Sequence, residues 1–170
     1  AVLLGGCFGI AYYLLEPALP GRGTGRPLVL AGSWFLTISV VPWLVLPPFA
    51  PGAVHVLSTD VRFMLYGALV VLGAAIAVGA VRIYKRLAPR SRTLGIAGGV
   101  LPVVTAILVI PTVSPSLVTH PTLSEAAVAA YRAIVVVSQG SIWLLIAVTF
   151  SWLQRRTLFE ATPTEPPQAT

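Results

Sequence analysis

Four ionisable side chains carry the chemistry that this sequence offers most directly, which is metal coordination. His55 and Asp60 lie in one connection, and His120 and Glu125 lie in another. Imidazole and carboxylate groups suit divalent cobalt or nickel. The two histidines are far apart in the sequence, and no short ligand spacing forces them together. We therefore treat these four residues as candidate metal ligands, with ordinary surface-loop histidines as the alternative.

Other kinds of site find little support in the residue pattern. Cys7 is the single cysteine and lies in an apolar run, so neither an internal disulfide nor a cysteine metal cluster is expected. Each histidine sits in a loop that contains proline, which argues against a bis-histidine haem site. No nucleophile, general base or metal constellation stands out. The sequence predicts a protein that is not an enzyme, for which a divalent cation would be a substrate.

Long apolar runs occupy most of the chain and must position these groups. Hydrophobic residues make up 56% of the sequence and charged residues 9%, whereas a soluble domain usually carries about 25% charge. Runs of about 18 apolar residues can cross a bilayer as helices, and none of these alternates like a barrel strand. The runs are 1–15, 28–46, 63–81, 94–110 and 128–153.

The fold prediction is an all-α integral membrane protein, a polytopic bundle of five transmembrane helices. The bundle occupies residues 1–156, and a disordered cytoplasmic tail rich in proline and threonine occupies 157–170. Ala1 begins in the middle of an apolar pattern. We therefore expect one more helix upstream.

The basic residues predict how the bundle is oriented. Nine of the eleven fall on alternating connections or after the last run: Arg22, Arg26, Arg82, Lys85, Arg86, Arg90, Arg92, Arg155 and Arg156. The positive-inside rule places these loops and the C-terminus in the cytoplasm. Because the charges flank membrane spans, anionic lipid headgroups are the expected partner, and no nucleic acid is expected.

Prolines interrupt the second run and the connection after it. Pro42 should kink the span near its end, because proline has no backbone N–H to donate. Pro47, Pro48 and Pro51, followed by Gly52, cannot continue a regular helix and predict a rigid extended turn at the outer interface.

Polar residues and small residues mark the other helices. Thr122 and Glu125 form a capping-box pattern that predicts the start of the last helix. In that helix, Arg132 should lie near the outer interface and Gln139 deeper, where helix–helix hydrogen bonding is favoured over contact with a substrate. Small pairs one turn apart, such as Gly95 and Gly99 or Ala75 and Gly79, predict close helix packing.

Several of these motifs together resemble a known family. The segment 41–52 contains Pro42 and the Pro47-Pro48 turn, 110–113 contains Pro111, and the last run contains Arg132, Gln139 and Trp143 in order. This arrangement is similar to the CbtA family of predicted cobalt transporter subunits, from the first run to the last. The resemblance implies a transport subunit in a prokaryotic inner or plasma membrane. It also implies a small single-span partner with a histidine-rich tail.

The chain departs from that family at several polar positions. The family usually has a Lys-Tyr pair where this chain has Val45 and Leu46, and Asn where it has Phe49. Polar or acidic residues are usual where this chain has Ser114 and Pro115. If those groups handle the ion, this protein has lost several of them.

Two functions therefore remain open at the level of sequence. The protein is either a subunit that moves a divalent cation with a partner, or a structural, accessory subunit of a larger membrane complex without transport activity of its own. Family resemblance favours the first. The shortage of charge within the spans favours the second, because ion paths usually need polar linings.

Overall fold

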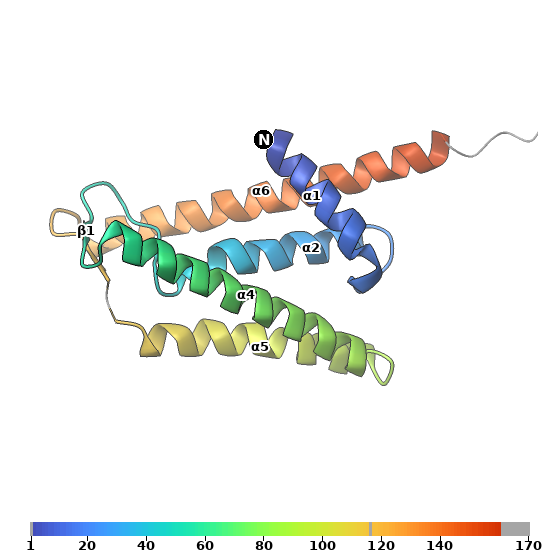
Figure 1. Cartoon of the computed structure of the whole chain (residues 1–170), viewed down its shortest axis with the longest axis horizontal. Helices are drawn as coiled ribbons and strands as arrows, with labels where there is room; N and C mark the ends of the chain where they lie inside the picture. The colour runs from blue at the N-terminus through green and yellow to red at the C-terminus, as the bar shows by residue number, and fades with distance from the viewer. Residues whose placement is uncertain (1, 116, 161–170) are drawn as a thin grey trace, which may run out of the picture.

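The computed structural model describes residues 2–115 and 117–160, and most of this length is helical (Figure 1). The helices are α1 (Val2–Leu15), α2 (Gly25–Phe35), α3 (Val41–Trp43), α4 (Thr59–Leu87), α5 (Arg92–Val113) and α6 (Glu125–Glu160). A 3₁₀ turn, η1 (Glu16–Ala18), follows α1, and a π-helical turn, η2 (Leu36–Val40), joins α2 to α3. Two short strands, β1 (Val54–His55) and β2 (Val118–Thr119), pair with each other. The predicted all-α membrane fold is confirmed.

Four of the helices in the described residues are long and apolar enough to cross a membrane. They cover Gly25–Val45, Thr59–Leu87, Arg92–Val113 and Glu125–Arg156, and so match the second to fifth predicted runs. The first predicted run forms the shorter apolar helix Leu3–Ala18, which falls below the length of a full span. Helix α6 extends to Glu160, past the predicted start of the tail, and the rest of that tail lies outside the described residues.

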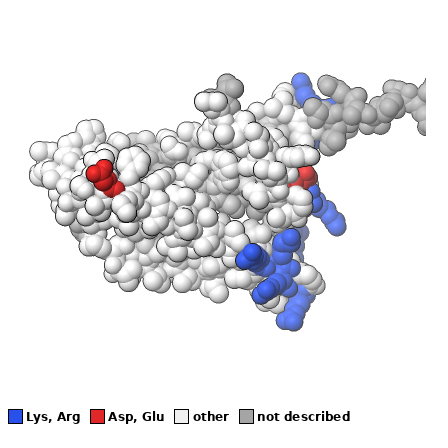
Figure 2. Space-filling model, in the orientation of Figure 1, with Lys and Arg blue, Asp and Glu red and all other residues white. Residues whose placement is uncertain are grey.

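Most of the basic side chains gather at one end of the bundle. Figure 2 shows Lys and Arg side chains around the connection from α4 to α5 and near the end of α6. We call this the basic end; it carries Arg82, Lys85, Arg86, Arg90 and Arg92. The opposite end, which we call the proline-rich end, carries the turn at Pro47–Gly52 and the paired strands β1 and β2. The predicted separation of basic connections from the other end therefore holds in space.

One hydrophobic cluster joins α1, α2 and α6. Phe8 is fully buried, and its ring packs edge-on against Trp34 of α2 and Phe150 of α6. Trp34 also packs edge-on against Trp143, with ring centroids 5.6 Å apart. Such aromatic pairs add to the dispersion energy that holds helices together where lipid removes most of the hydrophobic driving force.

A second cluster joins the middle of α2–α3 to the hairpin of α4 and α5. Val41 is fully buried against Leu36 and Ala77, and Val103 and Ile110 of α5 pack on the same cluster. Small residues allow the close approach within the hairpin. A Cβ added at Gly95 would lie 2.9 Å from the Cα of Ala88, and Gly99 is similarly close to Tyr84. The pair Gly95 and Gly99 is thus a packing motif as predicted, whereas Gly79 has open space beside it.

The predicted irregularity at Pro42 takes the form of a π-helical turn. Because Pro42 has no N–H, the carbonyl of Ile38, four residues earlier, loses its usual helical donor. The Tyr66 hydroxyl of α4 donates to this carbonyl over 2.9 Å. A side chain from a neighbouring helix therefore satisfies the backbone group that the proline leaves free, as membrane helices require.

The start of α6 differs in detail from the capping box expected at Thr122. The helix begins at Glu125, and the Ser124 hydroxyl accepts the N–H of Ala127 over 3.2 Å. Ser124 is therefore the N-cap, and Glu125 occupies the first helical position instead of the third. The reason is that Thr122 belongs to the loop that packs against Gly52. The Oγ1 atom of Thr122 lies 3.4 Å from the position that a Cβ would occupy at Gly52.

A close backbone approach between α4 and η2 predicts a sensitive position at Gly73. A Cβ there would lie 2.9 Å from the Cα of Thr37, a backbone atom that cannot move aside. Gly73→Ala should destabilise the protein by about 1–3 kcal/mol through overpacking. The measurement is the free energy of unfolding in mixed micelles. Gly79→Ala on the same helix, which meets no atom within 4 Å, is the matched control and should be neutral or slightly stabilising, because alanine favours a helix over glycine. Equal effects of the two variants would contradict this packing.

Candidate functional site

The proline-rich segment forms an extended stretch followed by a tight turn. Helix α3 ends at Trp43, residues 47–50 have no regular secondary structure, and the Ala53 N–H donates to the Ala50 carbonyl over 3.3 Å. Pro51 and Gly52 occupy the two central positions, and Gly52 has φ +80°. Proline followed by a residue with positive φ is the pattern of a type II turn. The extended turn predicted for Pro47–Gly52 is therefore present.

Two loops far apart in the sequence meet at this turn. Strands β1 and β2 pair antiparallel, with His55 opposite Val118 and Val54 opposite Thr119. The Nε2 atom of His120 accepts the backbone N–H of the buried Ala50 over 3.2 Å. His120 thus ties the loop before α6 to the proline-rich turn, and it holds a backbone donor that would otherwise lack a partner.

A cavity of about 360 Å³ lies beside the proline-rich turn, at the start of α4. The turn contributes apolar groups, and α4 and the strands contribute polar ones. The lining includes Trp43, Pro47, Pro48, Phe49, His55, Thr59, Arg62, Phe63, Tyr66 and Val118. We call this the outer cavity. A mainly apolar hollow with a few converging polar groups is the usual form of a ligand site.

Two of the polar groups that line the outer cavity have unused hydrogen-bonding capacity. The Nδ1 atom of His55 and the Nε atom of Arg62 are buried and have no hydrogen-bond partner in the described structure. The ring of His55 packs edge-on against Phe49, with centroids 4.6 Å apart, and the other end of the Arg62 guanidinium donates to Thr59. Native proteins leave few buried polar atoms unsatisfied, so these two point to a bound water, ion or ligand.

The four candidate metal ligands all lie at the proline-rich end, in different environments. His55 lines the outer cavity, whereas His120 uses its Nε2 atom to hold Ala50. Asp60 and Glu125 are exposed in the first turns of α4 and α6. Within the described residues, no group of three or more His, Cys, Asp or Glu side chains is close enough to hold a metal ion. The chain brings the candidates to one end without assembling them into a complete coordination shell there.

The motif residues of α5 and α6 have separate structural surroundings. Trp143 is buried in the α1–α2–α6 cluster, so its contacts are those of a packing residue. Gln139 is half-buried, and in the part of the chain that the structure describes its side chain makes no hydrogen bond. The Nε atom of Arg132 is buried and unpartnered. Pro111 is exposed in the last turn of α5, where Ser114 donates to the carbonyl of Ile110.

Sequence reasoning missed two residues of the outer cavity. Arg62 and Tyr66 lie one turn apart near the start of α4 and face the same cavity. A signal was present, because an arginine and a tyrosine flank Phe63 at the edge of an apolar run. What the sequence did not contain was the identity of the Tyr66 acceptor, the Ile38 carbonyl on another helix.

Comparison with known proteins identifies a family. The family model described as probable cobalt transporter subunit (CbtA) matches residues 1–155, which include the outer cavity and every candidate residue above. No curated protein and no solved structure matches the chain.

The contact between His120 and Ala50 predicts a local change when the imidazole is removed. His120→Ala should leave the Ala50 amide without its acceptor and raise its hydrogen-exchange rate about fivefold, since a net hydrogen bond contributes about 1 kcal/mol. Exchange at Ala50 is followed by mass spectrometry on peptides that cover the turn. Thr119→Ala, an exposed neighbour in β2, is the control and should leave this rate unchanged. Unchanged exchange in His120→Ala would show that the contact does not hold the turn.

Proposed function

The chain belongs to the family of probable cobalt transporter subunits, and from this membership we propose that it moves a divalent cation across the membrane together with other subunits, admitting the metal at its proline-rich end. The family description implies a non-enzymatic role. The match over residues 1–155 is the observation that carries the proposal. Cobalt is the first candidate ion, and nickel is the alternative with similar ligand preferences.

The need for other subunits is supported by how little of each span is buried. Within the most apolar part of each candidate span, between 11% and 33% of the residues are buried inside the chain. The α4–α5 hairpin and α6 therefore present most of their apolar surface outward. A small single-span partner with a histidine-rich tail is one proposed occupant of such surface, and the chains of a larger complex are another.

His55 is the residue that we propose as this chain's metal ligand. His55 lines the outer cavity, and its buried Nδ1 atom has no hydrogen-bond partner in the described structure, whereas the Nε2 atom of His120 is already engaged with Ala50. Asp60, Glu125 and His120 remain candidates for a wider set at the same end. Imidazole nitrogen is a common ligand for divalent transition metals.

Arg62 determines what must accompany the metal. It lines the same cavity as His55, and no carboxylate among the described side chains forms an ion pair with it. A guanidinium repels a bare dication, so a cation beside it needs anionic ligands to offset the charge. We propose that carboxylate groups from another protein of the complex supply this negative charge, and that further imidazole groups can complete the coordination shell.

The charge distribution supports the proposed orientation. Basic residues at the ends of α4 and α6 favour a cytoplasmic basic end, with the proline-rich end and the outer cavity on the opposite side of the membrane. A prokaryotic inner or plasma membrane suits a protein that takes up an ion from outside the cell.

An accessory role without transport is the second candidate. In the described spans the ionisable residues lie toward the helix ends. An ion path usually needs polar groups along its whole length, so this distribution supports the accessory role. In that case the chain would position or stabilise the subunits that do carry the ion.

The two candidate functions differ in what removal of His55 does to uptake. Cells that express the full transporter with His55→Ala should accumulate radioactive cobalt on the order of tenfold more slowly, since even indirect partners of a metal contribute 10–100-fold. Val56→Ala, an exposed residue next to β1, is the control and should transport normally.

Three outcomes separate the proposals. Slow uptake in His55→Ala alone supports a metal ligand at the outer cavity. Normal uptake in His55→Ala, together with loss of uptake when the whole chain is deleted, supports the accessory role and contradicts the His55 assignment. Normal uptake after deletion of the chain would contradict both.

A further inference from the structure

A second cavity lies near the basic end, between α1 with η1, α2 and α4. Its volume is about 450 Å³, and most of its lining is apolar. Leu15 and Leu19 line it from the N-terminal segment, Trp34 from α2, and Val78 and Val81 from α4. We call this the inner cavity. It is separate from the outer cavity, and no residue lines both.

The position of the inner cavity within spanning helices determines what can fill it. Val78 and Val81 belong to the candidate span Thr59–Leu87, and Trp34 belongs to Gly25–Val45. Water is a poor occupant of an apolar hollow, because each molecule needs two to four polar partners. In a bilayer, hydrocarbon chains are available at the same depth, and they can fill such a hollow without losing hydrogen bonds.

Two cations lie where this cavity reaches the basic end. Arg82 and Lys85 are exposed and contribute to its lining, one turn apart on α4. The Nζ atom of Lys85 donates to the carbonyl of Ala18 over 3.4 Å. This contact draws the ammonium group from α4 toward η1, across the edge of the cavity.

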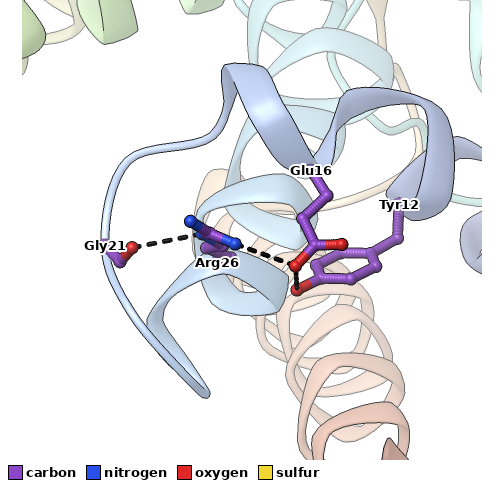
Figure 3. A network of polar contacts seen from close by, with 4 residues as sticks. All are labelled: Tyr12, Glu16, Gly21 and Arg26. Atoms are coloured by element: carbon purple, nitrogen blue, oxygen red, sulfur yellow. Dashed lines mark hydrogen bonds and ion pairs between the residues drawn. The ribbon is translucent and has the colours of Figure 1, made fainter.

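The nearby carboxylate is already engaged elsewhere. Figure 3 shows Glu16 accepting from the Arg26 guanidinium at 2.8 Å and from the Tyr12 hydroxyl at 3.5 Å. In the described part of the chain, neither Arg82 nor Lys85 forms an ion pair with a carboxylate. The two cations at the inner cavity are therefore available to an external anion.

We infer that the inner cavity binds an anionic phospholipid, with an acyl chain between α1, α2 and α4 and the phosphate at Arg82 and Lys85. An apolar interior next to paired cations matches the two parts of such a lipid. Basic pockets between membrane helices on the cytoplasmic side are known to take anionic headgroups, and an arginine can bind a phosphate through two parallel hydrogen bonds. The lipid would fill the space between α1–η1 and α4 and so stabilise the position of α1.

The test measures lipid binding to the full chain. The protein is purified in mild detergent and titrated with phosphatidylglycerol, and native mass spectrometry counts the lipid molecules bound to it. Arg82→Gln with Lys85→Gln should weaken phosphatidylglycerol binding on the order of tenfold, since each basic residue near the headgroup contributes appreciably. Arg90→Gln with Arg92→Gln removes the same charge from the same end but away from the cavity, and should have little effect. Phosphatidylcholine, which has no net charge, should bind more weakly than phosphatidylglycerol to the unmodified protein.

A second pair of variants tests the acyl-chain half without changing charge. Ala74 lines the inner cavity, and Ala74→Phe should fill it and displace the lipid. Ala75→Phe adds the same volume at an exposed neighbour on α4 that does not line it. Loss of binding in Ala74→Phe, with binding kept in Ala75→Phe, is the expected result.

Two outcomes would overturn the inference. Equal weakening by the two double charge substitutions would show general attraction to the basic end. Unchanged lipid binding in Ala74→Phe would show that the cavity holds no acyl chain, and a co-purifying helix of another protein in its place would identify the other occupant. None of these outcomes depends on cobalt uptake, so they are separate from the test of His55.

Discussion

The requirement that every backbone polar group in a membrane span finds a partner is the constraint on which the proline-rich end depends. Pro42 frees the Ile38 carbonyl, and the Tyr66 hydroxyl satisfies it from another helix. That contact fixes the start of α4 against η2. The outer cavity lies next to this contact, with Trp43 of α3 on one side and Arg62 and Tyr66 of α4 on the other. The irregular helix end and the candidate site are thus one structural feature.

The packing explains why the chain suits a role within a complex of several proteins. Aromatic contacts bind α1, α2 and α6 into one cluster, and small residues bind α4 to α5, while Leu36 and Val41 join the two. These contacts still leave most of each span facing outward. The ionisable groups that could bind ligands lie at the two ends of the bundle. At the proline-rich end, His55 and Arg62 have nitrogen atoms without hydrogen-bond partners. At the basic end, Arg82 and Lys85 are cations that no carboxylate pairs with among the described residues.

The sequence predicted the features that hydropathy and charge control directly. The four full-length helices match the later apolar runs, and the basic connections gather at one end, because burial in lipid selects both patterns strongly. The turn at Pro51–Gly52 was predictable for a local reason, since only a few backbone conformations suit that pair. The cap of α6 was displaced from Thr122 to Ser124, because the loop packs Thr122 against Gly52. The pairing of β1 with β2 and the bonds of His120 and Tyr66 join distant segments, and neither propensity nor spacing contains that information.

The most direct measurement is backbone hydrogen exchange across residues 43–46 in Tyr66→Phe. The variant keeps the ring and removes the hydroxyl that bonds to Ile38, and Tyr13→Phe, an exposed tyrosine on α1, is the matched control. Because such bonds in membrane proteins average about 0.6 and reach about 1.7 kcal/mol, exchange should become roughly 3- to 20-fold faster in Tyr66→Phe alone. The same rates in both variants would contradict the claim that this bond holds the proline-rich end and its cavity in place.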